Sequence, residues 1–435
     1  MPVDGARSKS PAIRVTTVYA TNATMPFTHQ GQEPGRFLGL GRLASYYDRS
    51  AAQLPQVIGH RSVPPEDVKF TRWRRHDRLQ AATTWSFMLP TGQVIAAISL
   101  DLHCQPVDTV DVLTDCYYED VAIDENPLGV TLLSGLSGDG AYELFPERHQ
   151  LVFIPTDSPR TTGRKVLSKT GVNEDVLQRI IYRADLPYRP EYSSIVYPPE
   201  LNRRLSAAAG IGPYVSVLAG QQDYVENGAF LSAVQAVGSS ARLREIRTDA
   251  YDSVRELDVT PTAPLSLRER RQRLEALADK LSRIEVDLSR GVEAPADLDL
   301  LVPSLRLNNF HGTLFDCMCL TEQATTVARM ISRIERAIAA ELTSIESAER
   351  RSDDRRRARW AVAVGFISTV AVPVTIILGF FGINAREVDN GTSMFDSRYL
   401  PVYLLSGLFV AIAGLLYIGL YVQHRSHDRI TESTG

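Results

Sequence analysis

Two long uncharged segments dominate the hydrophobic pattern of the C-terminal part of the chain. Ala361–Phe381 holds twenty-one residues without an ionisable side chain, and Leu400–Val422 is equally uncharged. An α-helix rises about 1.5 Å per residue, so the first segment covers roughly the 30 Å hydrocarbon core of a bilayer. A backbone inside lipid has to satisfy its own hydrogen bonds, which favours helices. The pattern therefore predicts a transmembrane hairpin, with a first helix at 360–382, an extracytoplasmic loop at 383–399 and a second helix at 400–422.

The region before the first apolar segment has the periodicity of long helices. Between Ser304 and Gly382 the only proline is Pro373, and apolar residues recur at three- and four-residue steps, as in a helix with one buried stripe. These apolar residues are Val327, Ile331, Ile334, Ile338, Leu342 and Ile345. A shorter run at 264–289 has leucine and isoleucine at heptad-like spacing, which is typical of an amphipathic helix. We therefore predict a helical stalk region at 264–359 that continues into the first apolar segment without interruption.

Residues 1–257 combine strand and helix signals. Thr84–Leu89 and Gln93–Leu102 are predicted strands, and the Pro-Thr-Gly sequence between them predicts a hairpin. His149–Pro155 is a further predicted strand, and much of Val225–Leu257 is predicted to be helical. The predicted fold class is therefore an α+β domain, followed by a long stalk helix and a C-terminal two-helix transmembrane hairpin.

The distribution of arginine predicts the orientation of the hairpin. Six arginines precede the first apolar segment, at Arg350, Arg351, Arg355, Arg356, Arg357 and Arg359. Arg425 and Arg429 follow the second segment, whereas the connecting loop holds two arginines and three acids. Short flanks rich in lysine and arginine stay in the cytoplasm. Both termini, including the tail at 423–435, are therefore predicted to be cytoplasmic in a multi-pass protein of the inner (plasma) membrane. The N-terminal residues show no signal-peptide pattern, and four cysteines in 435 residues fit a reducing compartment.

One face of the first apolar segment carries mainly small or hydroxylated residues. At 3.6 residues per turn this face contains Ala361, Val364, Gly365, Ser368, Val372, Thr375 and Gly379. Membrane helices use small residues wherever two backbones approach closely, so close packing is one interpretation. The other interpretation is that several copies of this helix surround a narrow pore, with Ser368 and Thr375 as polar rings. The stripe by itself favours packing.

The end of this segment carries a resemblance to a known family. Gly382-Ile383-Asn384 closes the first apolar helix, after a long stalk and before a short outer loop. In this arrangement the chain resembles the CorA family of divalent-cation transporters over roughly its last 170 residues. The resemblance implies a homopentamer around the first helix, with Asn384 at the outer pore mouth and Thr375 and Val372 facing the pore further in. It thereby shifts the interpretation of the stripe, with Ser368, from packing toward pore lining.

An asparagine ring suits the transport of a hydrated cation. Magnesium holds its waters tightly, and side-chain carbonyls accept hydrogen bonds from those waters without stripping them. The motif linked most closely to magnesium is Gly-Met-Asn, whereas this chain has Ile383 in the middle. Similar motifs in the family are linked to zinc, so the resemblance implies Mg²⁺, Zn²⁺ or cobalt as the transported ion. The loop also departs from the family pattern, because Arg386 and Glu387 stand where magnesium-type members carry a Met-Pro-Glu element.

Residues 79–147 contain eleven acids and no lysine or arginine. An acidic field of this kind attracts cations, and at subunit contacts it could bind Mg²⁺ or Zn²⁺ as a regulatory ion. Asp108, Asp111 and Asp115 are the candidate ligands. The alternative is a solvated acidic surface that balances the arginine-rich remainder of the chain.

No pattern in the sequence indicates an enzyme or a prosthetic group. Leu38-Gly39-Leu40-Gly41 lacks the third glycine of a nucleotide-binding turn. The net charge is −4 and the arginines cluster beside the apolar segments, so a nucleic-acid partner is not indicated. The expected partners are membrane lipid, further copies of the same chain and divalent metal ions. The alternative function is a non-conducting CorA-like membrane sensor or scaffold, whose acidic domain signals through the same hairpin.

Overall fold

The computed structural model divides the chain into two compact units. The first comprises residues 1–264 and 272–338, and the second comprises 265–271 and 339–435. The residues described are 12–26, 32–134, 136, 142–155, 174–186, 193–203, 208–220, 223–258, 266–299, 301–382, 391, 393, 396–412 and 414–415. Within 366–382, several positions are described by their backbone alone.

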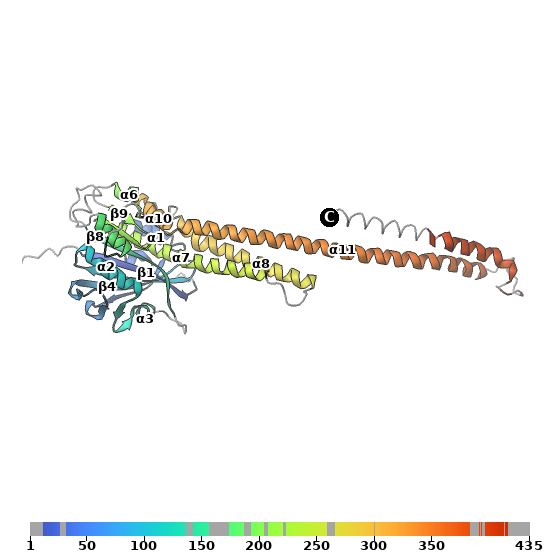
Figure 1. Ribbon diagram of the computed structural model, residues 1–435, viewed down its shortest axis with the longest axis horizontal. Coiled ribbons are helices and arrows are strands. Elements are labelled where there is room, and N and C mark those ends of the chain that lie inside the picture. Colours follow the sequence, from blue (N-terminus) through green and yellow to red (C-terminus); the bar gives the residue numbers. More distant parts are fainter. Residues whose placement is uncertain are drawn as a thin grey trace, which may run out of the picture. The chain divides into compact units, whose positions relative to one another are not determined.

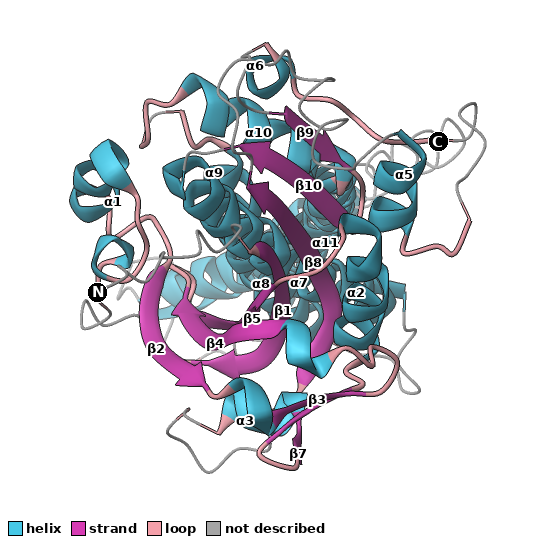
Figure 2. Ribbon diagram, turned by 90° about the vertical axis from the view of Figure 1, so that its left-hand side faces the viewer, coloured by secondary structure: helices cyan, strands magenta, loops and turns pink. Residues whose placement is uncertain are grey.

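A seven-stranded sheet forms the centre of the first unit (Figure 2). Its strand order is β2-β4-β5-β1-β8-β10-β9, with antiparallel neighbours except for the parallel pair β8 and β10. The strands are β1 (Ile13–Thr24), β2 (Gln56–Val63), β4 (Leu79–Met88), β5 (Gln93–Leu102), β8 (Leu144–Pro155), β9 (Ala208–Ile211) and β10 (Val215–Gly220). The predicted hairpin is confirmed, because β4 and β5 pair in antiparallel register with Thr84 opposite Ile98. The strand predicted at His149–Pro155 is the second half of β8.

Helices cover both faces of this sheet (Figure 2). On one face a large apolar core joins alternate strand residues such as Val15 to α2 (Thr109–Tyr118), α3 (Leu128–Leu133) and α5 (Glu174–Tyr182). On the other face the long helix α7 (Asp223–Asp258) packs against β1, β5 and β8. The described residues of this unit also form the shorter helices α1 (Ala44–Arg49), α6 (Pro199–Asn202), α9 (Ala294–Ala296) and α10 (Leu305–Cys317). The predicted α+β class and the helix expected at Val225–Leu257 are confirmed.

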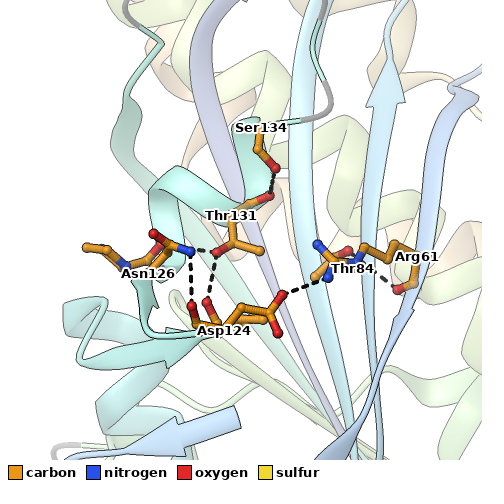
Figure 3. A network of polar contacts seen from close by, with 8 residues as sticks. Arg61, Thr84, Asp124, Asn126, Thr131 and Ser134 are labelled. Carbon is orange, nitrogen blue, oxygen red and sulfur yellow. Dashed lines mark hydrogen bonds and ion pairs between the residues drawn. The ribbon is translucent and has the colours of Figure 1, made fainter. Parts of the chain in front are cut away.

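A small sheet at the edge of the unit contains a strained turn. Its strands are β3 (Val68–Phe70), β6 (Val121–Ile123) and β7 (Asn126–Pro127). The two residues between β6 and β7, Asp124 and Glu125, both have left-handed backbone angles, with φ of 50° and 66°. Arg61 of β2 donates to the Asp124 carboxylate at 2.7 Å, and the Asn126 side chain donates to the Asp124 carbonyl at 3.0 Å (Figure 3). These contacts hold a conformation that residues other than glycine rarely adopt.

Three long helices lie side by side in the first unit (Figure 1). They are α7, the part of α8 (Leu267–Leu288) that starts at Gln272, and the part of α11 (Leu320–Gly382) that ends at Ile338. Lys280 of α8 forms an ion pair with Glu256 of α7 at 2.7 Å. The predicted apolar stripe of α11 is buried at Val327, Ile331, Ile334, Ile338 and Ile345, and its sixth residue, Leu342, is partly buried. The long-helix prediction is thus confirmed for α11.

The predicted helical run from Ser304 is divided by a short break. Helix α10 ends at Cys317, and α11 begins at Leu320. Cys319 between them has a φ of 56°, and its N–H donates to the Asp316 carbonyl at 2.9 Å. A single left-handed residue is enough to end one helix and start another in a new direction. After α8 the chain behaves differently. A π-helical turn at Ser289–Glu293 leads directly into α9, so the chain stays helical through Gly291 and Pro295 and the helix ends at Ala296.

The second unit consists mainly of helix. It contains α11 from Ala339 onward, a further helix at 400–412, and the first turn of α8. Arg270 at the start of α8 donates to the Glu341 carboxylate of α11 at 2.7 Å. Over the part of the chain that the structure describes, no helix is both long and apolar enough to cross a membrane. The transmembrane hairpin at 360–382 and 400–422 stays a prediction.

Candidate functional site

The predicted pore-lining residues lie on an exposed face of α11. Ser368, Val372 and Thr375 are all exposed, with 46% of the Val372 surface accessible. The Thr375 hydroxyl donates to the Ala371 carbonyl at 2.8 Å, which leaves the lone pairs of its oxygen directed away from the helix. One turn later, Gly379 has no heavy atom within 4 Å of the position that a Cβ would take. Among the described residues, these stripe positions are therefore exposed, and the Cβ position at Gly379 is open.

Apolar exposure extends beyond the stripe to other sides of the helix. Trp360 and Ile367 are 64% and 65% exposed. The helix at 400–412 and the residues that follow it expose Leu400, Leu404, Leu405, Leu408, Phe409, Val410, Ile412 and Leu415. Leaving each large apolar side chain in water forfeits about 1.5–3 kcal/mol relative to burial. Such a surface indicates that an apolar partner, lipid or protein, covers this part of the chain.

The arginines that precede the apolar segment form an exposed group on the same helix. Arg350, Arg351, Arg355, Arg356, Arg357 and Arg359 are all exposed on α11. Their spacing distributes positive charge around the helix directly before Trp360, where the uncharged segment starts. Gly382 is the last residue of α11, while Ile383 and Asn384 lie outside the described residues. The role of the Gly-Ile-Asn motif stays a prediction.

Of the three acidic metal candidates, Asp115 has an evident structural role. Its side chain is fully buried in α2 and accepts hydrogen bonds from the backbone N–H groups of Arg72 (2.9 Å) and Trp73 (3.0 Å). Burial raises the pKa of Asp115 above its ordinary value, and the two backbone donors oppose that rise. These contacts fix the loop that carries Trp73, a fully buried core residue.

The other two candidates have different surroundings from Asp115. Asp108 pairs with Arg75 at 2.6 Å and accepts the backbone N–H of Gln105 at 3.3 Å, so it stabilises the 3₁₀ turn Pro106–Asp108 that precedes α2. Asp111 is exposed on the first turn of the same helix. Among the described residues, no three side chains of His, Cys, Asp or Glu lie close enough together to hold a metal ion.

One cluster of charges is not evident from the sequence pattern. Arg14 of β1 forms ion pairs with Asp101 of β5 at 2.7 Å and with Glu226 of α7 at 3.1 Å. The signal in the sequence is alternation: Arg14 and Thr16 interrupt one apolar strand, and Ser99 and Asp101 interrupt another. The sequence does not show which strands are neighbours or how they are aligned. The cluster can therefore be recognised only once the strand register is known.

Comparison with known proteins gives structural neighbours of low sequence identity. No family model and no curated protein matches the chain. Among solved structures, the full-length CmaX protein is 14% identical, with a TM-score of 0.26, over 66% of this chain and 91% of its own. The CorA magnesium transporter from Methanocaldococcus jannaschii is 11% identical, with a TM-score of 0.25, over 62% of this chain and 89% of its own. Because both TM-scores are low, the function has to be inferred from the residues of this chain.

Proposed function

We propose that the chain is a CorA-like transporter or channel for a divalent cation, Mg²⁺, Zn²⁺ or cobalt, in the inner membrane. Five copies surround a pore lined by the first apolar segment, and both termini face the cytoplasm. The single observation that carries the proposal is the course of α11. This one helix runs from Leu320 through the arginine group and the small-residue stripe to Gly382, the first residue of the Gly-Ile-Asn motif.

The composition of the stripe supports conduction of a hydrated ion. Small residues leave room along a helix bundle axis, and the hydroxyl oxygens of Ser368 and Thr375 accept hydrogen bonds from the waters of a cation. Neither hydroxyl carries a charge, so an ion is not held too strongly to leave. Asn384 in this proposal is the first ring that an ion meets from outside, and its amide oxygen likewise contacts the hydration shell.

The proposal assigns no chemical reaction to the protein. The ion is cargo, no prosthetic group is required, and the acidic residues of the first unit serve to concentrate cations or to bind a regulatory Mg²⁺ or Zn²⁺. Movement of the stalk part of α11 couples that binding to the pore.

Flux through purified protein in liposomes tests the proposal directly. Vesicles are loaded with dyes for magnesium or zinc, and uptake is compared for wild type, Asn384→Leu and Asn390→Leu. Asn390 is a matched control, because it is an asparagine of the same outer loop but not of the motif. We expect Asn384→Leu to abolish selective uptake and Asn390→Leu to retain it.

Two outcomes contradict the proposal. Equal uptake in wild type and Asn384→Leu removes the role of the asparagine ring. An absence of divalent-ion uptake by folded, pentameric wild-type protein favours the non-conducting sensor or scaffold instead.

A further inference from the structure

The charged residues just before the apolar segment of α11 are distributed unevenly around the helix. Between Arg350 and Arg359 the sequence has six arginines and two acids, Asp353 and Asp354. All of these side chains are exposed. Arg350 lies 4.0 Å from Glu346 of the same helix, whereas among the described residues the other five arginines form no ion pair. Exposed arginines without a carboxylate partner attract anions from their surroundings.

The direction of the small-residue stripe divides these charges into two sets. Successive residues of an α-helix are about 100° apart around its axis. The stripe residues that precede Pro373, and that define its direction here, are Ala361, Val364, Gly365 and Ser368. The charged residues within about 75° of that direction are Arg350, Asp353, Asp354 and Arg357. Those about 90° or more away, which we call the outer arginine face, are Arg351, Arg355, Arg356 and Arg359.

The two sets differ in net charge. On the stripe side two arginines are balanced by two aspartates, whereas the outer arginine face has four positive charges and no acid in this stretch. In the proposed pentamer the stripe faces the pore axis, so the outer arginine face is directed away from the axis and toward the surrounding membrane. The inference below therefore rests on the proposed function. Balanced charge beside the axis suits the passage of a cation, while the excess of positive charge attracts an anionic partner from outside the bundle.

The outer arginine face lies at the depth of the lipid headgroups in this arrangement. Trp360 follows it directly and is 64% exposed. Tryptophan at the end of a membrane-spanning helix is typical of the interface between lipid and water. Arg359 and Arg355 precede Trp360 by about 1.5 and 7.5 Å along the helix axis, and the headgroup layer on each side of a bilayer is roughly 5–8 Å thick. Their long side chains can therefore reach phosphate oxygens, which guanidinium groups bind through two parallel hydrogen bonds.

We propose that the outer arginine face binds anionic phospholipids of the cytoplasmic leaflet. The guanidinium groups donate hydrogen bonds to the headgroup phosphate, and the net negative charge of the lipid provides the preference. A zwitterionic lipid offers the same phosphate but carries a cation beside it, so its attraction to four arginines is weaker. One arginine near an anionic membrane surface strengthens binding by roughly fivefold.

Quenching of Trp360 by brominated lipids tests this inference. The full-length protein is reconstituted in liposomes of phosphatidylcholine and phosphatidylglycerol, in which one lipid or the other has brominated chains. Trp360 reports on the lipids beside the arginines, because the other two tryptophans, Trp73 and Trp85, are buried in the first unit. Trp360→Phe gives the background signal. We expect phosphatidylglycerol to be preferred beside Trp360 by roughly fivefold or more, and added salt to reduce this preference.

Two double variants separate the outer arginine face from net charge. Arg355→Gln with Arg359→Gln removes two arginines of that face, whereas Arg350→Gln with Arg357→Gln removes two from the stripe side of the same ten residues. Both variants therefore have the same net charge. We expect the first to quench nearly equally with the two lipids and the second to keep the preference of wild type. Equal loss in both variants overturns the assignment, since it shows a response to net charge alone.

Three other outcomes also overturn the inference. Equal quenching of wild type by both lipids shows that anionic headgroups are not preferred. Displacement of phosphatidylglycerol by inorganic phosphate at constant ionic strength assigns the arginines to a free anion. Absence of quenching by either lipid shows that Trp360 is not in contact with a membrane, and contradicts the proposed function as well. Because quenching is read without ion flux, a lipid preference in a protein without cation uptake contradicts the proposed transport alone.

Discussion

At the scale of single residues, two buried histidines lead us to predict that the first unit is sensitive to acid. His311 of α10 is 1% exposed and lies 4.4 Å from the Phe315 ring. Its Nε2 donates to the Pro295 carbonyl at 2.8 Å, and its Nδ1 has no hydrogen-bond partner among the described residues. Protonation of Nδ1 would place a charge in this apolar site, so burial lowers the pKa of His311 to about 4, against an opposing effect of Pro295 and Asp297.

The lowered pKa of His311 predicts a loss of stability in mild acid. Below its ordinary pKa of 6.5, the unfolded chain takes up a proton that the folded chain does not. The free energy of unfolding therefore falls as the pH decreases from 6.5 toward about 4, by about 1.4 kcal/mol per pH unit for this group. In His311→Gln, whose amide can still donate to Pro295, we expect a smaller fall in Tm over this range.

The comparison is made by thermal unfolding of the full chain, followed by tryptophan fluorescence. His76→Gln is the control, because His76 is exposed, and its pH profile should match that of wild type. Some pH dependence should persist in His311→Gln, since burial also lowers the pKa of His149, to about 3. An unchanged profile in His311→Gln would show that the acid sensitivity arises elsewhere.

At the scale of elements, the turn between β6 and β7 stores strain that glycine would relieve. Glu125 has a φ of 66° and an exposed ion pair with Lys69 at 3.2 Å, which contributes little to stability. A left-handed residue other than glycine costs on the order of 1 kcal/mol. We expect Glu125→Gly to leave the free energy of unfolding unchanged or to raise it by up to about 1 kcal/mol, despite the greater flexibility of glycine in the unfolded chain.

Glu66→Gly provides the contrast for this prediction. Glu66 is also an exposed acid, but it lies in the 3₁₀ turn Pro65–Asp67, where its φ is not positive. Glycine there brings only the entropic cost, so the free energy of unfolding should fall by roughly 0.5–1 kcal/mol. The Tm of Glu66→Gly should fall, whereas the Tm of Glu125→Gly should stay the same or rise, and an equal decrease in both would contradict the strain argument.

Periodicity explains which elements the sequence predicts well. The hairpin of β4 and β5 has local turn chemistry, and α11 has a stripe that repeats over many turns, so both are specified by neighbouring residues. The break at Cys319 has neither glycine nor proline, and its left-handed angle depends on the surrounding fold. The strand order, with β8 beside β10, and the meeting of Arg14, Asp101 and Glu226 depend on long-range register, which a single sequence does not display.

At the scale of the whole molecule, the predicted pore stripe lies on surface that the described residues of one chain leave exposed. The stripe of α11 and the residues at 400–415 expose apolar surface that a single chain leaves uncovered. Helix periodicity is enough to find the stripe, but packing and pore lining favour the same small residues. Packing and pore lining differ in what lies next to the stripe. In the proposed pentamer, other copies of α11 lie next to it.

Two glycines allow this neighbour to be tested. Gly379 of α11 and Gly414 of the second helical segment both have open space where a Cβ would lie, with no heavy atom of the described residues within 4 Å apart from the neighbouring helix backbone. Leucine also favours helix over glycine by roughly 0.5–1 kcal/mol. We therefore expect an effect that Gly379→Leu has and Gly414→Leu lacks to come from contacts with other copies or from a blocked pore.

We expect Gly379→Leu to abolish cation uptake in liposomes, to lower the oligomeric state measured by light scattering, or both, whereas Gly414→Leu should do neither. Loss of uptake with an intact pentamer assigns Gly379 to the pore, because only the space along its axis has then been filled. Loss of the pentamer assigns it to the contact between helices. If Gly379→Leu assembles and conducts as wild type does, the stripe faces lipid, and the first apolar segment is not the one that surrounds the pore.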